Sequence, residues 1–157
     1  MTIPYESATS GDRALAELQR ILAKFGCSTF GTMTDAERGC TIVQFKWRGR
    51  MVALEASWKG YATTYLKAHP HTYKTRATLA EHQQRAMLQA QVSVCSALRD
   101  FVKGQITIVE CGVMSFETAF GMHLLLPNGL RVVDVVAQHL QLEDKTNVVD
   151  LPQRSST

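Results

Sequence analysis

The first clear pattern is a helical repeat of hydrophobic residues near the start of the chain. Between Ser10 and Gly26 these residues recur every three or four positions, as they do on one face of an amphipathic helix. Ser10 is a residue type that caps helix N-termini, and Gly26 suits the left-handed conformation that often ends a helix. We therefore expect a helix between them. Its apolar stripe comprises Ala14, Leu15, Leu18, Ile21, Leu22 and Phe25.

After this helix the hydrophobic period shortens to two, which is typical of β-strands. The alternation predicts strands at residues 28–34, 41–47 and 51–58, joined by turns at 35–39 and 48–50. The second turn is Arg-Gly-Arg, in which the glycine is available for a positive φ. Strands joined by such short turns pair antiparallel, so the segment should form a three-stranded meander.

Helical periods return in the second half of the chain. Residues 61–68 predict a short helix that ends before Pro70, and residues 71–76 form a basic connector. A long helix should follow, because Thr78 and Glu81 have the spacing of a capping box and an apolar face continues beyond them.

Residues 105–112 are compatible with two structures. The apolar face of the long helix stays in phase across Gly104, through Ile106 and Val109, which favours a continuous helix. The run from Ile106 to Val109 is also rich in β-branched residues and is typical of a strand. We expect the helix, although the pattern alone leaves the strand open.

The last part of the chain predicts short elements. Ser115 should cap a brief helix that contains Phe116 and Phe120. Residues 124–133 fit either a second, smaller hairpin or a strand–turn–helix, because they contain a Pro-Asn-Gly turn. Apolar residues between Val132 and Leu140 fit a final helix.

Together these elements predict a single α+β domain over residues 1–142, followed by a mobile polar tail at residues 143–157. An antiparallel three-stranded meander would pack against amphipathic helices. One long helix would be central, and a small hairpin or strand–turn–helix would lie at the C-terminal end. The uncharged faces of the long helix could be covered within one chain or across a homodimer.

Composition excludes several classes of protein. Hydrophobic residues make up 45% of the 157 positions and charged residues 20%, as in globular proteins. No apolar run approaches the roughly 20 residues of a membrane span, and the first residues have no signal-peptide pattern. The four cysteines lack zinc-site spacing, and we expect them to be buried free thiols.

Catalytic and metal motifs are absent from the sequence. It has no glycine-rich phosphate loop and no paired-carboxylate motif, so we expect no cofactor and no enzymatic activity. His69, His71 and His82 lack a carboxylate or cysteine to complete a metal site. Cys111 with His123 is a weak candidate for thiol chemistry, and a core cysteine explains it more simply.

Residues 46–85 are strongly basic. They carry eight Lys or Arg side chains against two acidic ones, whereas the net charge of the whole chain is +3. The same residues include both tryptophans and three of the four tyrosines. Cations interleaved with aromatic rings are typical of surfaces that bind a polyanion with stackable bases. Arg85 is an exception, because Glu81 one helical turn earlier should pair with it.

We therefore expect a nucleic-acid interface made from the turn at residues 48–50, the short helix and the basic connector, provided that all three share one face. Cations would contact phosphates and Tyr61 would stack on a base, with Trp58 at the end of its strand as a second ring. The pattern does not distinguish DNA from RNA, or single from double strands. The expected contact residues are Lys46, Arg48, Arg50, Lys59, Tyr61, Lys67, Lys74 and Arg76.

Four segments of the chain carry a resemblance to known proteins. They are GDRALAELQRILAKFGCSTFGTMTD (11–35), GYATTYLK (60–67), LRDFVKGQITIVECGVMSFETAF (98–120) and LLPNG (125–129). In these segments the chain resembles a family of small, functionally uncharacterised proteins encoded by tailed phages and prophages of proteobacteria. The genes of that family tend to lie among early genes. The resemblance thus implies a role in the cytoplasm of the infected host rather than in the virion, and it identifies no functional residue.

Two functional hypotheses follow. The first is a non-enzymatic phage accessory protein that binds nucleic acid through the basic residues named above. The alternative is an anti-defence inhibitor, similar to an anti-CRISPR protein, that binds a host protein or ribonucleoprotein. The same basic surface would then meet acidic groups on that partner.

Overall fold

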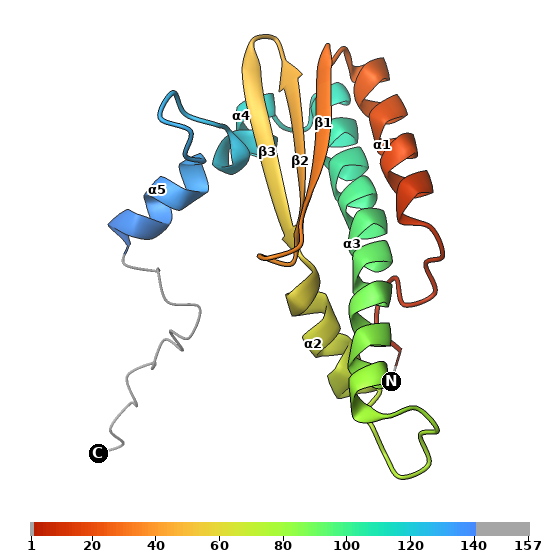
Figure 1. The fold of residues 1–157 in the computed structure, drawn as a ribbon. Coiled ribbons are helices and arrows are strands. Elements are labelled where there is room, and N and C mark those ends of the chain that lie inside the picture. The colour runs from red at the N-terminus through yellow and green to blue at the C-terminus, as the bar shows by residue number, and fades with distance from the viewer. Residues whose placement is uncertain (1, 141–157) are drawn as a thin grey trace, which may run out of the picture.

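The computed structural model describes residues 2–140 and has the α+β fold expected from the sequence (Figure 1). Helices pack against one face of a small antiparallel sheet, and a long helix runs through the centre. The tail predicted at residues 143–157 lies outside the described residues.

Helix α1 spans Gly11–Phe25, and both of its ends have the expected residues. The Ser10 side chain accepts a hydrogen bond from the Arg13 backbone N–H at 3.2 Å. Gly26 ends the helix with a φ of 95°, in the left-handed region that favours glycine. Leu18 and Leu22 are fully buried, so the predicted stripe faces the core.

The sheet consists of β1 (Thr29–Asp35), β2 (Cys40–Trp47) and β3 (Arg50–Ser57) in the order β1-β2-β3. Both pairings are antiparallel, so the predicted meander is confirmed. Phe45 lies opposite Phe30 on one side and Val52 on the other. One face of the sheet is therefore apolar and packs against the helices.

A two-residue turn joins β2 to β3, one residue shorter than expected. Arg48 has a φ of 46° and Gly49 a φ of 80°, as a tight hairpin requires at both central positions. Arg50 belongs to the strand and pairs with Trp47. A left-handed conformation is uncommon for arginine, and Gly49 makes the tight turn accessible.

Helix α2 spans Trp58–Ala68 and begins three residues earlier than predicted. The Ser57 side chain accepts a hydrogen bond from the Gly60 N–H at 3.1 Å, which caps the helix at its first turn. Trp58 is therefore the first residue of a helix rather than the last of a strand. Its indole N–H donates to Thr41 Oγ1 at 2.7 Å in the core, and the side chain is buried.

Helix α3 spans Leu79–Glu110 without interruption, so residues 105–110 are helical and the strand alternative is excluded. Thr78 and Glu81 form the expected capping box at its N-terminus. Ile106 is buried in phase with the rest of the apolar face, which explains how the helix continues across Gly104.

The C-terminal part of the described chain forms a strand–turn–helix. Helix α4 (Phe116–Phe120) and a 3₁₀ turn, η1 (Gly121–His123), lead to a short extended stretch beside β3. There the Leu125 N–H donates to the Met51 carbonyl oxygen at 2.8 Å. After the turn, α5 spans Val132–His139.

The hydrophobic core lies between the inner face of the sheet and the helices α1, α3 and α4. The hairpin between β2 and β3 lies at one end of the molecule, beside the end of α3 (Figure 1). The loop from α2 to α3, residues 69–78, projects at the other end. This elongated arrangement decides which basic residues can act together. The most deeply buried large side chains are Phe45, Phe120, Leu18, Leu22, Val43, Val52 and Val102.

Candidate nucleic-acid interface

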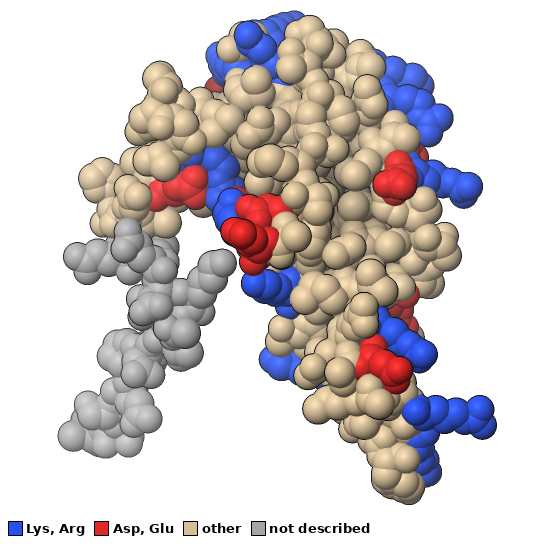
Figure 2. Space-filling view, in the orientation of Figure 1, with Lys and Arg blue, Asp and Glu red and all other residues tan. Residues whose placement is uncertain are grey.

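The predicted basic residues divide into groups at opposite ends of the molecule. We call Lys46, Arg48 and Arg50 the hairpin tip. Strand β3 begins at Arg50 of the tip and its eight residues span about 26 Å of extended chain before α2. The 11 residues of α2 add about 16 Å before the α2–α3 loop begins. Figure 2 accordingly shows Lys and Arg atoms at the top and again at the bottom, with acidic atoms and further basic atoms on the surface between them.

The structure therefore does not bring the tip and the connector onto one small surface. The sequence analysis expected the turn, the short helix and the connector to share one face because all three lie within residues 46–85. The β3 strand and α2 run away from the tip in the same general direction, so residues that follow the hairpin are carried steadily away from it (Figure 1).

Two of the three side chains in the hairpin tip are engaged within the protein. Arg50 forms an ion pair with Glu117 of α4, and this contact lowers the pKa of the Glu117 carboxyl. The Arg48 guanidinium lies 4.5 Å from the centre of the Trp47 ring. That ring in turn stacks on Phe25 at 5.1 Å. Lys46 is exposed.

Lys59 is also held by the protein. It lies in the first turn of α2, and its ammonium donates to the Glu37 carbonyl oxygen at 3.3 Å. Its alkyl chain lies over Gly39, in the turn between β1 and β2. Lys59 thus closes the lower end of the sheet and is not oriented towards the α2–α3 loop.

The two rings expected to stack on bases are not available as free surfaces. Trp58 is 4% exposed, so the expectation of a partly exposed ring at the end of a strand is wrong. Tyr61 packs against the core, and its hydroxyl donates to the Pro4 carbonyl oxygen at 2.6 Å. The N-terminal segment therefore covers part of the helix face that carries Tyr61.

An exposed ring that the sequence analysis did not select occurs in the α2–α3 loop. Tyr73 is 92% exposed. Tyr73 and Lys74 are the central residues of a turn, in which the Thr75 N–H donates to the Thr72 carbonyl oxygen at 2.9 Å. The Thr72 N–H donates to Thr75 Oγ1 at 3.0 Å, so the turn is closed from both sides. The Lys74 ammonium lies 5.7 Å from the centre of the Tyr73 ring.

Histidines fix the loop that presents this ring. His71 Nε2 donates to the Ala77 carbonyl oxygen at 2.8 Å, and the His71 and His82 rings lie 5.5 Å apart. His82 Nε2 donates to the His69 carbonyl oxygen at 2.7 Å, and His69 pairs with Glu6. These contacts give the three histidines a structural role. Within residues 2–140 there is no group of three or more His, Cys, Asp or Glu that could hold a metal ion.

The exposed cations near Tyr73 lack carboxylate partners in the part of the chain that the structure describes. Lys74 and Arg76 are exposed on the loop, and Lys67 is exposed in the last turn of α2. Arg85 makes no ion pair there with Glu81, contrary to expectation. The Glu81 carboxylate instead accepts the Thr78 N–H at 2.8 Å, a contact that lowers its pKa. We call Lys67, Tyr73, Lys74 and Arg76 the loop surface.

The cysteines offer no assembled catalytic group. Cys40 and Cys95 are buried, as expected, but Cys111 is exposed at the end of α3, so the expectation of a core position there is wrong. Burial raises the pKa of the Cys27 thiol to about 11, which keeps it protonated at neutral pH. The His123 ring packs edge-on against Phe101, and burial lowers its pKa. No hydrogen bond among the described residues joins Cys111 to His123.

Comparisons with known proteins return no match among protein-family models, curated proteins or solved structures. The resemblance to phage proteins stays a prediction. No helix among residues 2–140 is long and apolar enough to cross a membrane. The functional argument therefore rests on the geometry of the side chains.

Proposed function

We propose that this protein binds single-stranded nucleic acid without catalysing a reaction, and that the loop surface makes the contact. The observation that carries the proposal is Tyr73, a 92% exposed ring at the tip of a closed turn, beside the cation Lys74. The resemblance to phage early proteins supports placing this activity in the cytoplasm of an infected bacterium.

The exposure of Tyr73 supports a stacking role, because a ring that is 92% exposed buries little area in the fold and keeps its face free for a base. A tyrosine that packs on the protein loses most of its exposed area, as Tyr61 does. A ring held out by a hydrogen-bonded turn keeps a face open to a base without the cost of ordering the loop on binding. Base stacking on such a ring requires an unpaired base, which favours single strands over duplexes.

The cations around Tyr73 have the arrangement that a phosphate backbone requires. Lys74 and Arg76 flank the ring at spacings of one and three residues, and Lys67 lies at the end of the helix that leads into the loop. Their charges are not cancelled by ion pairs within residues 2–140. The hairpin tip adds long-range attraction for a polyanion, but Arg50 is neutralised there by Glu117.

The salt dependence of binding tests this proposal. Binding of a fluorescein-labelled 15-nucleotide oligothymidine should give a log–log slope against salt of about −2, since each of three phosphate contacts contributes about −0.7. Fluorescence anisotropy between about 50 and 300 mM NaCl measures the slope. A duplex of equal length should bind more weakly. An absence of binding at low salt, or a slope near zero, contradicts the proposal.

A second candidate function is docking on a host protein, as an anti-defence inhibitor would do. One observation favours it: the face of the sheet opposite the core carries Met33, which is 56% exposed, in a shallow hollow with Ile42 and Gln44. Nuclease treatment of a bacterial lysate distinguishes the two candidates. A partner that is retained after nuclease and lost with Met33→Lys supports docking, whereas loss on nuclease treatment supports nucleic-acid binding.

A further inference from the structure

The two edges of the sheet differ in how they are covered. On the β3 side, the Leu125 N–H donates to the Met51 carbonyl oxygen at 2.8 Å, and Leu124 forms an isolated bridge with Val52. Strand β1 at the opposite edge pairs only with β2 among residues 2–140. Five of its seven residues are exposed. The backbone groups on the outer side of β1 therefore have no strand partner in the described part of the chain.

Strand β1 lacks the features that usually protect an edge strand. Protected edges carry charged side chains, prolines or bulges. Residues 28–34 contain neither a charged residue nor a proline, and β1 pairs with β2 without a bulge from Thr29 to Asp35. The seven residues present a regular edge about 23 Å long. An edge of this kind is suited to pairing with a strand of another chain.

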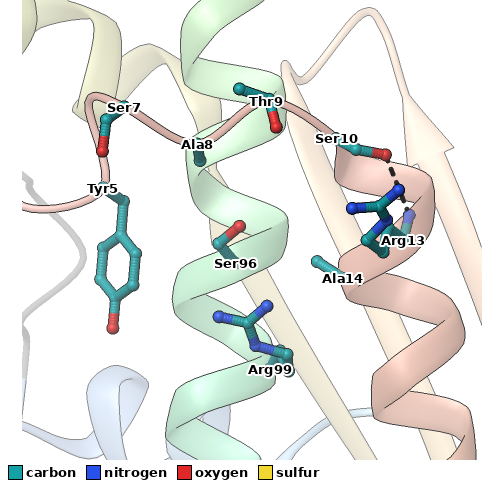
Figure 3. A pocket seen from close by; sticks show the side chains of 9 residues that line it. All are labelled: Tyr5, Ser7, Ala8, Thr9, Ser10, Arg13, Ala14, Ser96 and Arg99. Atoms are coloured by element: carbon teal, nitrogen blue, oxygen red, sulfur yellow. Dashed lines mark hydrogen bonds between the residues drawn. The ribbon is translucent and has the colours of Figure 1, made fainter.

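Helix α1 lies beside this edge without covering it (Figure 1). Arg13 lies on the side of the helix that faces α3 and the N-terminal segment, where it lines a crevice (Figure 3). Leu15 lies on the side nearer the sheet, where it lines a hollow together with Thr34 of β1. Helical spacing places Gln19 and Ala23 on that same side, and both are exposed and uncharged. This stretch of α1 therefore adds no charge that would repel a second copy at the edge.

The outer face of β1 has a shape that fits its own copy. Antiparallel pairing of two β1 strands with full overlap places Thr32 opposite Thr32 of the second copy and Met33 opposite its Gly31. Met33 is 56% exposed and lines a hollow of about 140 Å³ together with Gly31, Ile42 and Gln44. In this register the Met33 side chain of each copy lies over the hollow of the other.

The same close approach explains the glycine at position 31. The backbone of Gly31 does not have a positive φ, and a Cβ atom added there would meet no atom within 4 Å. The fold of a single chain therefore does not require glycine at this position, although glycine weakens a strand interior. A glycine in a strand often marks a place where another chain approaches closely, and the opposing Met33 supplies such a neighbour.

The register also brings opposite charges together at both ends of the paired strands. Asp35 lies opposite Thr29 of the second copy, and Thr29 in turn pairs with Lys46 of β2. Asp35 and that Lys46 thus lie on one face at two strand spacings, about 10 Å between backbones, with a small threonine between them. Neither side chain forms an ion pair within residues 2–140. A lysine side chain can span this distance, so the two-fold arrangement contains two ion pairs.

We propose that two copies of this protein associate through their β1 strands, which pair antiparallel about a two-fold axis at Thr32 and form one six-stranded sheet. The partner is a second copy of the chain because both the shape and the charge of the edge match themselves in this register. The hollow beside Met33 is then covered by the second copy rather than by a host protein. The two loop surfaces project at opposite ends of the dimer, so the association does not depend on nucleic-acid binding.

Analytical ultracentrifugation of protein free of nucleic acid tests the association. The wild-type protein should change from one chain to two as its concentration rises from low micromolar to several hundred micromolar. Thr32→Lys should raise the dissociation constant by roughly fivefold or more, because it places like charges directly opposite each other at the two-fold axis. Thr32 is exposed, so the single chain should still fold, which circular dichroism verifies. The matched control is Thr64→Lys, at an exposed position of α2, which should dimerise as wild type.

Lys46→Glu tests the register of the paired strands. It places a carboxylate near Asp35 of the second copy at both ends and should weaken the dimer several-fold. Lys103→Glu makes the same change of charge at an exposed position of α3 and should not weaken it. The proposal is overturned if the wild-type protein stays a single chain throughout the concentration range, or if either variant dimerises as tightly as its control. Lys74→Gln with Arg76→Gln should dimerise as wild type, because the loop surface lies outside the paired edge.

Discussion

Replacing Trp58 with alanine is expected to lower the free energy of unfolding by about 3–5 kcal/mol, as for other buried tryptophans. The ring is 4% exposed in the core between the sheet and α3. The substitution leaves a cavity and removes the partner of Thr41, whose side chain is itself buried. Since domains of this size are stable by only about 5–15 kcal/mol, the variant should be close to unfolding. Urea denaturation followed by circular dichroism measures the change.

Trp58→Phe separates the two contributions. It keeps most of the ring volume but removes the indole N–H that donates to Thr41, and should cost about 1–3 kcal/mol. The matched control is Tyr73→Ala, which should change stability by less than about 0.5 kcal/mol because the ring is 92% exposed. A cost below about 1 kcal/mol for Trp58→Ala is inconsistent with the burial described above.

Tyr73→Ala is expected to weaken binding of a single-stranded oligonucleotide by about 5- to 150-fold, which corresponds to the 1–3 kcal/mol that one stacked base contributes. The reason is the loss of the only large ring on the loop surface. Tyr73→Phe keeps the ring and should retain most of the affinity. Anisotropy titration at about 100 mM salt measures both variants.

Tyr61→Phe serves as the control for the ring. It removes a hydroxyl that is bonded to Pro4 and leaves the loop surface intact, so the affinity should stay at the wild-type value. If Tyr73→Ala binds as tightly as wild type, or Tyr61→Phe weakens binding as much as Tyr73→Ala does, the assignment of the stacking ring is incorrect.

Much of the fold was accessible from the sequence because local signals agree with the tertiary structure. The caps of α1 and α3 are set by residues within three positions of the helix start. The strands of the meander were visible from the two-residue period of the sequence, although burial in the structure runs over consecutive residues, 40–43 in β2 and 52–54 in β3. The continuation of α3 across Gly104 followed from the phase of its apolar face.

The start of α2 could not be predicted, because two local signals compete there. Alternation continues up to Trp58, which favours a strand, while Ser57 can cap a helix. The hydrogen bond from Trp58 to Thr41 joins residues 17 positions apart and holds the indole of the first residue of α2 in the core. Such tertiary contacts override local propensity and leave no mark in the sequence.

The candidate site was less accessible than the fold. Sequence proximity grouped the hairpin tip with the connector, although β3 and α2 carry them apart. Arg50 is paired with Glu117 across 67 positions, a contact that no spacing rule indicates. The sequence does contain a signal for the exposure of the Tyr73 ring. It lies in a polar turn, Thr-Tyr-Lys-Thr, with no apolar periodicity to bury it.

The central claim is that the loop surface, rather than the hairpin tip, contacts nucleic acid. Two double variants test it directly, because each removes two cations from a chain of net charge +3. Lys74→Gln with Arg76→Gln alters the loop surface. Lys46→Gln with Arg48→Asn alters the tip and keeps a residue that tolerates the positive φ of 46° at position 48.

The measurement is the affinity of each double variant for the same oligothymidine across a range of salt concentrations. The loop variant should bind roughly tenfold more weakly at 100 mM salt, and its log–log slope should fall by about 1.4, or 0.7 for each lost phosphate contact. The tip variant should keep the wild-type slope and lose less than about threefold in affinity through long-range attraction alone. Equal losses, or a larger loss in the tip variant, would contradict the account.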